Sequence, residues 1–321
     1  MKKGMILIKY VKQLDYILIP IVFISSIVFR KIRKIGINLF PRSKRIMLNK
    51  GVFPIIDHYY EPLFDSKHLY KDLNKERNLP GINLNIEDQL SLLKSFNFQS
   101  EFKNIPNQHI NDSIFNFNNN SFDSGDAQYW YSLIRLKKPR NIIEIGSGNS
   151  TKMARLAIEF NNKEDSNYEC NHICIEPYEM PWLENIGVKV LREKVENLDL
   201  SFFEILNEND ILFIDSSHMI RPQGDVLFEF LELIPSLKSG VIIHVHDIFS
   251  PRDYPKEWVV DFVRLWNEQY LLEAFLNYNN SYKIIGALNL LYNNHNELFN
   301  DKCPILVENA MVPSSFYFTK C

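Results

Sequence analysis

Two stretches of this 321-residue sequence place acids and histidines directly after short apolar runs. The runs are residues 211–214 (ILFI) and 241–245 (VIIHV). The polar residues that follow them are Asp215, His218, His246 and Asp247. Two carboxylates with two imidazoles are the composition of a divalent-metal site or of a site that abstracts a proton. We therefore predict that these four side chains are catalytic.

The two apolar runs have the length and content of buried strands. In an open parallel sheet, ligands bind at the carboxyl ends of the strands, so both polar groups should meet at one edge. A metal there would take Asp215 and Asp247 as ligands. Without a metal, His218 or His246 would be a general base, held in one tautomer by a neighbouring acid. His244 lies inside the second run, and we interpret it as a core residue.

A glycine turn lies upstream, in the sequence IIEIGSGNST of residues 142–151. Its β-branched residues predict a short strand, and Gly146 and Gly148 allow a sharp turn that approaches a ligand closely. The apolar spacing of residues 151–161 predicts a helix after the turn. A second strand at 172–175 ends at Glu176, where a carboxylate can accept hydrogen bonds from ribose hydroxyls. Strand, turn and helix together predict a nucleotide cofactor.

Four motifs in order, EIGSGNST, IEP, ILFIDSSH and GVIIHVHDIF, resemble those of class I S-adenosylmethionine-dependent methyltransferases. The closest similarity is to small-molecule and sugar O-methyltransferases of bacterial polysaccharide and macrolide pathways. The resemblance covers about residues 126–294 and implies a doubly wound, mostly parallel seven-stranded α/β sheet of the Rossmann-like methyltransferase type. It also implies S-adenosylmethionine as the cofactor. The cofactor residues that it implies are Glu144, Gly146, Ser147, Gly148, Glu176 and Asp215.

Metal-dependent relatives in this class carry carboxylates at two strand ends, and Asp215 and Asp247 correspond to these, with Mg²⁺ as the candidate ion. An alcohol is a poor nucleophile until its proton leaves, which explains why a base or a metal is needed. We therefore expect an S-adenosylmethionine-dependent O-methyltransferase acting on a hydroxyl of a sugar, glycan or related small molecule. The alternatives are a metal-dependent hydroxylase, a nicotinamide oxidoreductase and a non-catalytic membrane-bound scaffold. Thr151, where a dinucleotide fingerprint has its third glycine, counts against the nicotinamide alternative.

The sequence suggests three regions: a basic, apolar segment at 1–50, an irregular cap or linker region at 51–125 and the catalytic domain at 126–321. Within the second region, residues 84–96 have the spacing of an amphipathic helix. The Asn- and Ser-rich residues 99–125 favour a linker or surface loop. In the catalytic domain we expect helices near 126–138 and 225–237, and later strands at 282–291 and 316–319.

Charge is distributed unevenly, with a net charge of +11 over residues 1–50 and −14 over the remainder. A basic segment on an acidic body favours contact with anionic headgroups and argues against nucleic acid as a partner. The fourteen-residue apolar run at 16–29 is short for a membrane crossing, so we expect a peripheral, interfacial anchor, with a buried packing helix as the alternative. The four cysteines show no metal or disulfide spacing. The expected location is cytoplasmic, at the inner face of the membrane.

Residues 254–270 (YPKEWVVDFVRLWNEQY) follow the second polar cluster. Trp258, Phe262 and Trp266 are spaced at i, i+4 and i+8, which predicts a helix with a core-facing stripe. In the loop before it, we expect Arg252, Asp253 and Tyr254 to contact the substrate.

Overall fold

The computed structural model describes residues 2–178, 180–305 and 312–321 and divides the chain into two compact units, Met1–Asp72 and Leu73–Cys321. This boundary differs from the expected ones at residues 50 and 125. Residues 73–125 therefore belong to the same unit as the predicted catalytic domain.

The first unit contains the helices α1 (Lys2–Ile35) and α2 (Pro41–Asn49) and the short turns η1 (Ile37–Leu39) and η2 (Ser66–His68). The apolar run at 16–29 is the middle of a much longer helix that continues through Pro20. Its residues Tyr10–Ile35 are long and apolar enough to cross a membrane, and an 18-residue window within them has a mean hydropathy of 1.7. In the irregular segment that follows α2, the aromatic rings of Tyr59 and Tyr60 are exposed.

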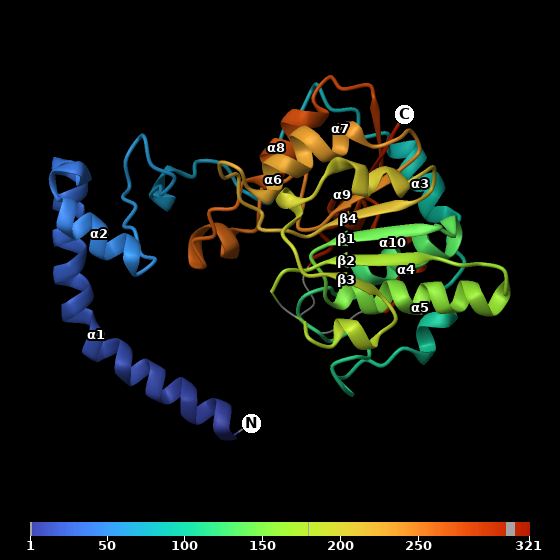
Figure 1. Cartoon of the computed structure of the whole chain (residues 1–321), viewed down its shortest axis with the longest axis horizontal. Helices are drawn as coiled ribbons and strands as arrows, with labels where there is room; N and C mark the ends of the chain where they lie inside the picture. Colours follow the sequence, from blue (N-terminus) through green and yellow to red (C-terminus); the bar gives the residue numbers. More distant parts are fainter. Residues whose placement is uncertain (1, 179, 306–311) are drawn as a thin grey trace. The chain divides into compact units, whose positions relative to one another are not determined.

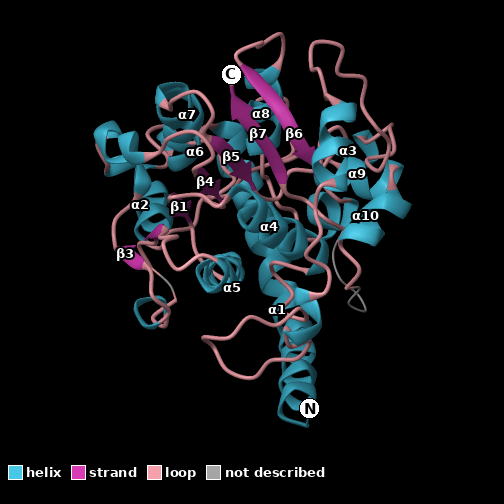
Figure 2. Ribbon diagram, turned by 90° about the vertical axis from the view of Figure 1, so that its right-hand side faces the viewer, coloured by secondary structure: helices cyan, strands magenta, loops and turns pink. Residues whose placement is uncertain are grey.

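The second unit is built on a seven-stranded sheet in the order β3-β2-β1-β4-β5-β7-β6 (Figures 1 and 2). β7 pairs antiparallel with both β5 and β6, whereas the other pairs are parallel. This topology confirms the predicted doubly wound, mostly parallel sheet. The strands are β1 (Asn141–Ile145), β2 (Asn171–Ile175), β3 (Lys189–Leu191), β4 (Ile211–Ile214), β5 (Ile242–Val245), β6 (Tyr282–Ala287) and β7 (Phe316–Lys320).

Helices cover both faces of the sheet because successive strand residues point to opposite sides, each into its own apolar core. One core packs the sheet against α3 (Ile86–Lys94), α4 (Ser124–Lys137), α5 (Asn149–Glu164), α9 (Leu288–Asn294) and α10 (Asn296–Lys302). The other packs it against α6 (Asp225–Phe228), the π-helical turn η7 (Glu229–Leu233), α7 (Ile234–Ser236) and α8 (Glu268–Leu276). Short turns complete the unit: η3 (Glu101–Asn104), η4 (Leu183–Asn185), η5 (Val195–Asn197), η6 (Leu200–Ile205) and the π-helical turn η8 (Glu257–Asp261).

The Asn-rich segment 99–125 is not a surface linker. Four of its phenylalanines, Phe102, Phe115, Phe117 and Phe122, lie in the core beside α4. Asn119 stabilises the turn before Phe122, because its side chain accepts from the Phe122 backbone N–H (2.8 Å) and donates to its carbonyl oxygen (3.0 Å). Asparagine satisfies the backbone of an irregular chain in this way, so a polar composition can still deliver aromatic rings to a core.

Two further element predictions were wrong. Residues 254–270 form no continuous helix: a single π-helical turn (η8) is followed by extended chain, and α8 begins only at Glu268. Val263 has a left-handed backbone (φ 51°), which a β-branched residue avoids in a helix, and Phe262 is 56% exposed. The strand expected at 282–291 ends at Ala287, where α9 begins.

Candidate functional site

The carboxyl ends of the four central strands lie side by side and bring the predicted motifs together. Just beyond the strand ends, the Gly146 N–H donates to the carbonyl of Ile175 on β2 (3.0 Å), and the Asp215 N–H donates to that of Ile145 on β1 (2.9 Å). The N–H of His246 likewise donates to the Ile214 carbonyl oxygen (2.9 Å). The strand ends are therefore level, and their polar side chains meet at one edge.

The glycine turn opens this edge. Gly146 has φ 78°, and a Cβ there would overlap the carbonyl oxygen of Asp215, so only glycine allows β1 and β4 to end this close together. A Cβ at Gly148 would meet no other atom within 4 Å. Glycine at 148 is thus not required by packing, and it leaves open space beside the first turn of α5.

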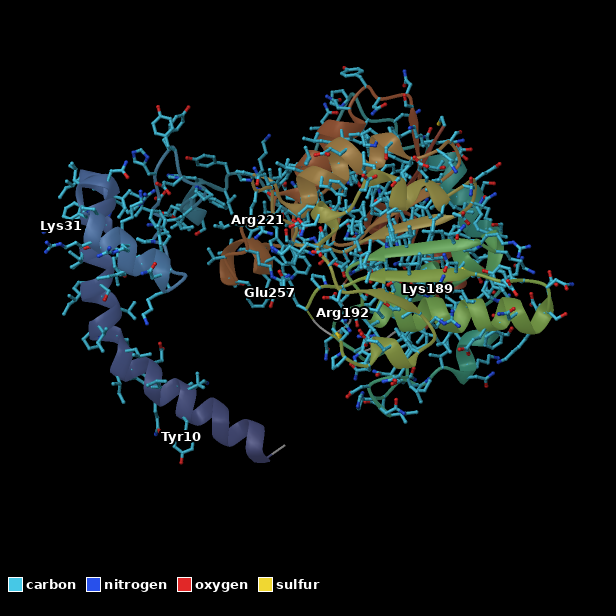
Figure 3. The ribbon with its side chains drawn as sticks, in the orientation of Figure 1. Tyr10, Lys31, Lys189, Arg192, Arg221 and Glu257 are labelled. Carbon is cyan, nitrogen blue, oxygen red and sulfur yellow. The ribbon has the colours of Figure 1, made fainter. Side chains whose placement is uncertain are left out.

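A cavity of about 370 Å³ lies at this edge. The predicted cofactor residues Gly146, Glu176 and Asp215 line it, as do Val195 and Glu196 after β3. The lining residues that the sequence motifs did not point to include Lys194, Arg221 and Asp225. Figure 3 labels Arg221, which follows β4 on the cavity side of the sheet. The cavity is of a size typical of cofactor sites, and apolar residues such as Ile145 and Val195 line it together with charged and hydroxyl side chains.

Glu144 does not line this cavity. Its carboxylate is fully buried between β2 and α5, where it meets the Nε2 of His172 (2.9 Å) and accepts from the Thr151 hydroxyl (2.6 Å). The Thr151 Oγ1 in turn accepts from the Gly148 N–H (3.1 Å). From its position in the core, Glu144 therefore stabilises the conformation of the glycine turn through Thr151. Of the other two predicted cofactor residues, Gly148 is the N-cap residue that precedes α5, and Ser147 lies within the turn.

Asp215, His218 and Asp247 form one cluster at the same edge. Their ligand atoms lie within 4.8 Å of one another. The His218 Nε2 faces both acids, at 3.3 Å from the Asp215 Oδ1 and 3.7 Å from the Asp247 Oδ2. His218 and Asp247 both have left-handed backbones with φ 58°. Such conformations are uncommon for these residues and concentrate at functional sites, where the surroundings hold a side chain in place.

Glu268 completes this cluster from α8. Its Oε2 lies 2.8 Å from the His218 Nδ1, and both groups are buried. Burial lowers the pKa of His218, but its contacts with Asp215 and Glu268 outweigh burial and raise the pKa well above 6.5. Sequence reasoning assigned no role to Glu268, because a helix residue fifty positions from His218 has no local signal that links the two.

His246 lies next to the cluster and is buried. Its Nδ1 is 3.3 Å from the Ser315 hydroxyl, and its Nε2 is 3.6 Å from the Asp247 Oδ1. Burial lowers its pKa, but the nearby carboxylates of Asp247, Asp215 and Asp126 raise it above its usual value. The Asp247 carboxylate also accepts from the Ser314 hydroxyl (3.1 Å). All four predicted catalytic side chains therefore lie together.

His244 is a core residue, as expected. It is fully buried and stacks on the Tyr317 ring at 4.1 Å, and burial lowers its pKa well below 6.5.

The three loop residues expected to contact substrate are engaged elsewhere in the unit. Arg252 binds the Asn74 carbonyl oxygen (3.0 Å) and Glu76 (3.0 Å). Asp253 pairs with Arg77, and the Tyr254 hydroxyl accepts from the Gln269 N–H (3.0 Å). These contacts fasten the loop after β5 to residues 74–77 and to α8.

Comparison with known protein families identifies the centre of this unit. Residues 143–248, from β1 to just beyond β5, match the model of a family described as "Methyltransferase domain". These residues are a methyltransferase domain. The match includes the glycine turn and both polar strand ends, and it confirms the predicted class I methyltransferase.

One relative and two solved structures that resemble this chain share less than 30% sequence identity with it. The chain is 29% identical over 202 residues to an uncharacterized protein of Archaeoglobus fulgidus, covering 59% of this chain and 89% of that protein. An O-methyltransferase from Bacillus cereus in complex with SAH superposes with a TM-score of 0.38 at 13% identity, over 72% of this chain and 91% of that one. The O-methyltransferase TomG from Streptomyces achromogenes, involved in tomaymycin synthesis and in complex with SAM, superposes with a TM-score of 0.37 at 13% identity, over 71% of this chain and 88% of that one.

The sequence motifs imply S-adenosylmethionine as the cofactor of this methyltransferase domain. The residues present fit it, because Glu176 stands at the end of β2 where ribose hydroxyls bind, and the open space at Gly148 adjoins the first turn of α5. When bound, S-adenosylmethionine supplies the methyl group.

Proposed function

We propose that this methyltransferase acts on oxygen, transferring a methyl group to a hydroxyl of a sugar, a glycan or a related small molecule. The observation that carries the proposal is the cluster of Asp215, His218 and Asp247 at the edge of the cofactor cavity. Asp215 belongs to both the cavity and the cluster, so a hydroxyl held by the cluster would lie beside the methyl donor. Transfer to an alcohol requires such a group because the hydroxyl must lose its proton.

We also propose that the cluster binds a divalent cation. Two carboxylates and one imidazole are a suitable donor set, and the contact between His218 Nδ1 and Glu268 resembles the carboxylate–histidine pairs that orient metal ligands. An imidazole ligand suits Mn²⁺ or Zn²⁺ better than Mg²⁺, which prefers oxygen. When bound, the cation would lower the pKa of the acceptor hydroxyl.

In this proposal, Asp215 and Asp247 hold the acceptor oxygen near the cavity, and His246 is the nearest side chain outside the ligand set that could take the hydroxyl proton. The contact of the His246 Nδ1 with Ser315 leaves its Nε2 directed toward Asp247. During transfer an oxygen–carbon bond forms, the carbon–sulfur bond of the cofactor breaks, and the proton passes to the base.

The test combines cofactor binding with turnover. Isothermal titration of the intact protein with S-adenosylhomocysteine should show binding, and its absence would overturn the proposal. Methyl transfer from labelled S-adenosylmethionine should then be assayed with hydroxyl-bearing glycan extracts, with and without EDTA. We expect EDTA to abolish transfer and Mn²⁺ to restore it more fully than Mg²⁺. Transfer that resists EDTA would exclude the cation and leave His218 or His246 as a metal-free base.

Asp247→Asn tests the cluster itself, because it removes a carboxylate that does not line the cavity. We expect turnover to fall by about 100-fold or more, as for the loss of a group that acts in the transition state, with unchanged binding of S-adenosylhomocysteine. Asp253→Asn is the matched control, since Asp253 also follows β5 but pairs with Arg77 and Tyr270. An equal loss of turnover in Asp247→Asn and Asp253→Asn would contradict the proposed role of the cluster.

For location, we propose that α1 inserts into a membrane and holds the protein at its cytoplasmic face. Apolar side chains are exposed all around the helix between Tyr16 and Val28, whereas an interfacial helix has a polar face. The 26 residues Tyr10–Ile35 would extend for about 39 Å as a helix, enough for a hydrocarbon core of about 30 Å. Eight Lys and Arg residues follow at positions 30–50, which favours the cytoplasmic side for the rest of the chain.

Flotation with lipid vesicles tests this location. The intact protein should float with vesicles and resist extraction by alkaline carbonate, and a protein lacking residues 2–35 should remain in the soluble fraction. Ile24→Lys, in the middle of the apolar run, should weaken partitioning, whereas Leu48→Lys on the exposed side of α2 is the matched control. Partitioning that does not depend on residues 2–35 would contradict the proposal.

A further inference from the structure

The guanidinium of Arg264 lies in a corner formed by two tryptophan rings. Its Cζ is 4.2 Å from the centre of the Trp258 ring and 4.3 Å from that of the Trp266 ring, and the two rings stand nearly perpendicular at 81°. The Arg264 N–H donates to the Trp258 carbonyl oxygen (2.8 Å), which fixes the reversal of the chain after η8. These two cation–π contacts, a third with the Phe262 ring at 5.6 Å and one backbone hydrogen bond therefore hold this arginine in a defined orientation.

The hydrogen-bonding capacity of the same guanidinium is unused within residues 2–178, 180–305 and 312–321, where it forms neither a side-chain hydrogen bond nor an ion pair. The nearby acids Glu257 and Asp261 are exposed and do not pair with it. The contacts with the aromatic rings satisfy none of the guanidinium N–H groups with an oxygen acceptor, so these donors remain available. A rigid, partly buried arginine with an open edge is suited to bidentate binding of a carboxylate or phosphate.

This corner adjoins the catalytic cluster. The Trp266 ring that contacts Arg264 also packs on the His218 ring, with 4.1 Å between centroids. The following residue, Asn267, donates from its N–H to the His218 carbonyl oxygen (3.0 Å) and accepts from the Ile220 N–H (2.7 Å). The segment that carries the arginine is thus fastened to the strand end that carries His218, one ring away from the proposed acceptor position.

We propose that Arg264, framed by Trp258 and Trp266, binds an anionic group of the methyl acceptor, so that the acceptor is an acidic sugar bearing a carboxylate or phosphate. The inference rests on the proposed function and names its substrate class. The indole rings hold the arginine in place, and the arginine binds the charged substituent. The hydroxyl on another carbon of the same ring then reaches the cluster of Asp215, His218 and Asp247. A neutral sugar would leave the arginine edge without a partner.

The test uses the intact protein saturated with S-adenosylhomocysteine and three probes: glucose, glucuronate and glucose 6-phosphate. Binding is followed by tryptophan fluorescence, which reports on Trp258 and Trp266, and by calorimetry. We expect one or both charged sugars to bind about 10-fold or more tightly than glucose, as expected for a charge-assisted bidentate contact. The two charged probes distinguish a carboxylate from a phosphate.

Arg264→Gln should reduce binding of the preferred charged sugar to the level of glucose, and Arg264→Lys should restore only part of it, because lysine keeps the charge but loses the planar fork. Arg140→Gln is the matched control, since Arg140 also lies over an aromatic ring, that of Tyr168, but at the amino end of β1. Equal binding of charged and neutral sugars, no binding of any probe, or an Arg264→Gln variant that retains the preference would overturn the inference. If the wild-type protein does not bind S-adenosylhomocysteine, that result would instead contradict the proposed function.

Discussion

Glu268 determines the orientation of His218. The ring has a carboxylate on each nitrogen, Glu268 at Nδ1 and Asp215 at Nε2, so its plane and its available nitrogen are both fixed. The neighbouring acids alone could not do this, because Asp215 and Asp247 both lie on the Nε2 side. The third carboxylate comes from a helix on one face of the sheet, outside the strand-end motifs.

We predict that Glu268→Gln lowers kcat/KM for methyl transfer by about 10- to 100-fold, as for loss of a carboxylate that orients a ligand histidine. Binding of S-adenosylhomocysteine should be unchanged, because Glu268 does not line the cavity. Glu257→Gln, at an exposed position on η8, is the control. Wild-type turnover in the Glu268 variant would mean that His218 needs no partner on Nδ1.

Glu229 is a second buried carboxyl group, and it affects stability. It is fully buried in η7, and its Oε2 accepts from the Ser216 hydroxyl (3.0 Å). Burial, and then the nearby carboxylates of Glu268 and Asp225, raise its pKa well above 4.5. Because the pKa is raised in the folded state, this group favours folding below its unfolded-state pKa and loses that contribution as the pH rises through the folded-state pKa.

We therefore predict that Glu229→Gln, which keeps an oxygen for Ser216 and removes the buried charge, raises the melting temperature by a few degrees at neutral pH, equivalent to about 1 kcal/mol. The difference from the wild type should shrink as the pH falls toward 4.5, because the wild-type carboxyl group is neutral there in the folded state and about half neutral in the unfolded state. Thermal denaturation between pH 4.5 and 8 measures this. A difference in melting temperature between the variant and the wild type that does not depend on pH would contradict the raised pKa of Glu229.

At the scale of elements, the strand-to-helix turn from β1 to α5 combines two glycines with different purposes. Gly146 is required by its left-handed backbone and by the closeness of Asp215, which are properties of the fold. Gly148 has open space around it, and we predict that the cofactor uses this space. Glu144 and Thr151 hold the turn from within the core, so the acid in the strand is structural.

Alanine at these two positions should separate the two purposes. We predict that Gly146→Ala destabilises the protein by about 2 kcal/mol or more, because the Cβ overlaps backbone atoms at a positive φ. Gly148→Ala should leave the melting temperature within about 2 °C and weaken S-adenosylhomocysteine binding about 10-fold or more, since its Cβ would occupy the space beside α5. Thermal denaturation measures the stability of each variant, and calorimetry measures its affinity for S-adenosylhomocysteine. Equal effects of the two variants would refute this division.

At the scale of the whole molecule, one unit contains everything that the chemistry requires. Both apolar cores of the sheet, the cavity and the cluster lie within residues 73–321. The first unit contains the apolar helix and most of the excess positive charge. The proposed binding and chemistry therefore belong to one part of the chain, and the proposed membrane location belongs to the other.

We predict that a protein comprising residues 73–321 folds and binds S-adenosylhomocysteine with an affinity within about twofold of the full chain, because no lining residue of the cavity is removed. Circular dichroism and calorimetry check this. A fragment starting at residue 126, the boundary expected from the sequence, should be insoluble or unfolded, since it loses Phe102, Phe115 and Phe117 from the core. A stable 126–321 fragment would contradict the importance of these rings.

Local signals in the sequence are sufficient to define the class of the catalytic unit. Strand ends are marked by β-branched runs that stop at glycine or at an acid, and the carboxyl ends of parallel strands must share one edge. Gly146, Asp215, His218, His246 and Asp247 can therefore be grouped from the sequence alone, and they do lie together at that edge. The parallel part of the sheet follows from the same alternation of strands and helices, whereas the count of seven strands was implied by the family resemblance.

The role of each of these side chains depends instead on tertiary packing. Glu144 turns inward because strand residues alternate between faces and its face meets α5, and Glu268 reaches His218 because α8 packs on the opposite face. The corner around Arg264 depends on a chain reversal at Val263 that interrupts an apparently helical sequence. Contacts between residues far apart in the chain leave no local pattern, since each depends on the packing of elements that are separately encoded.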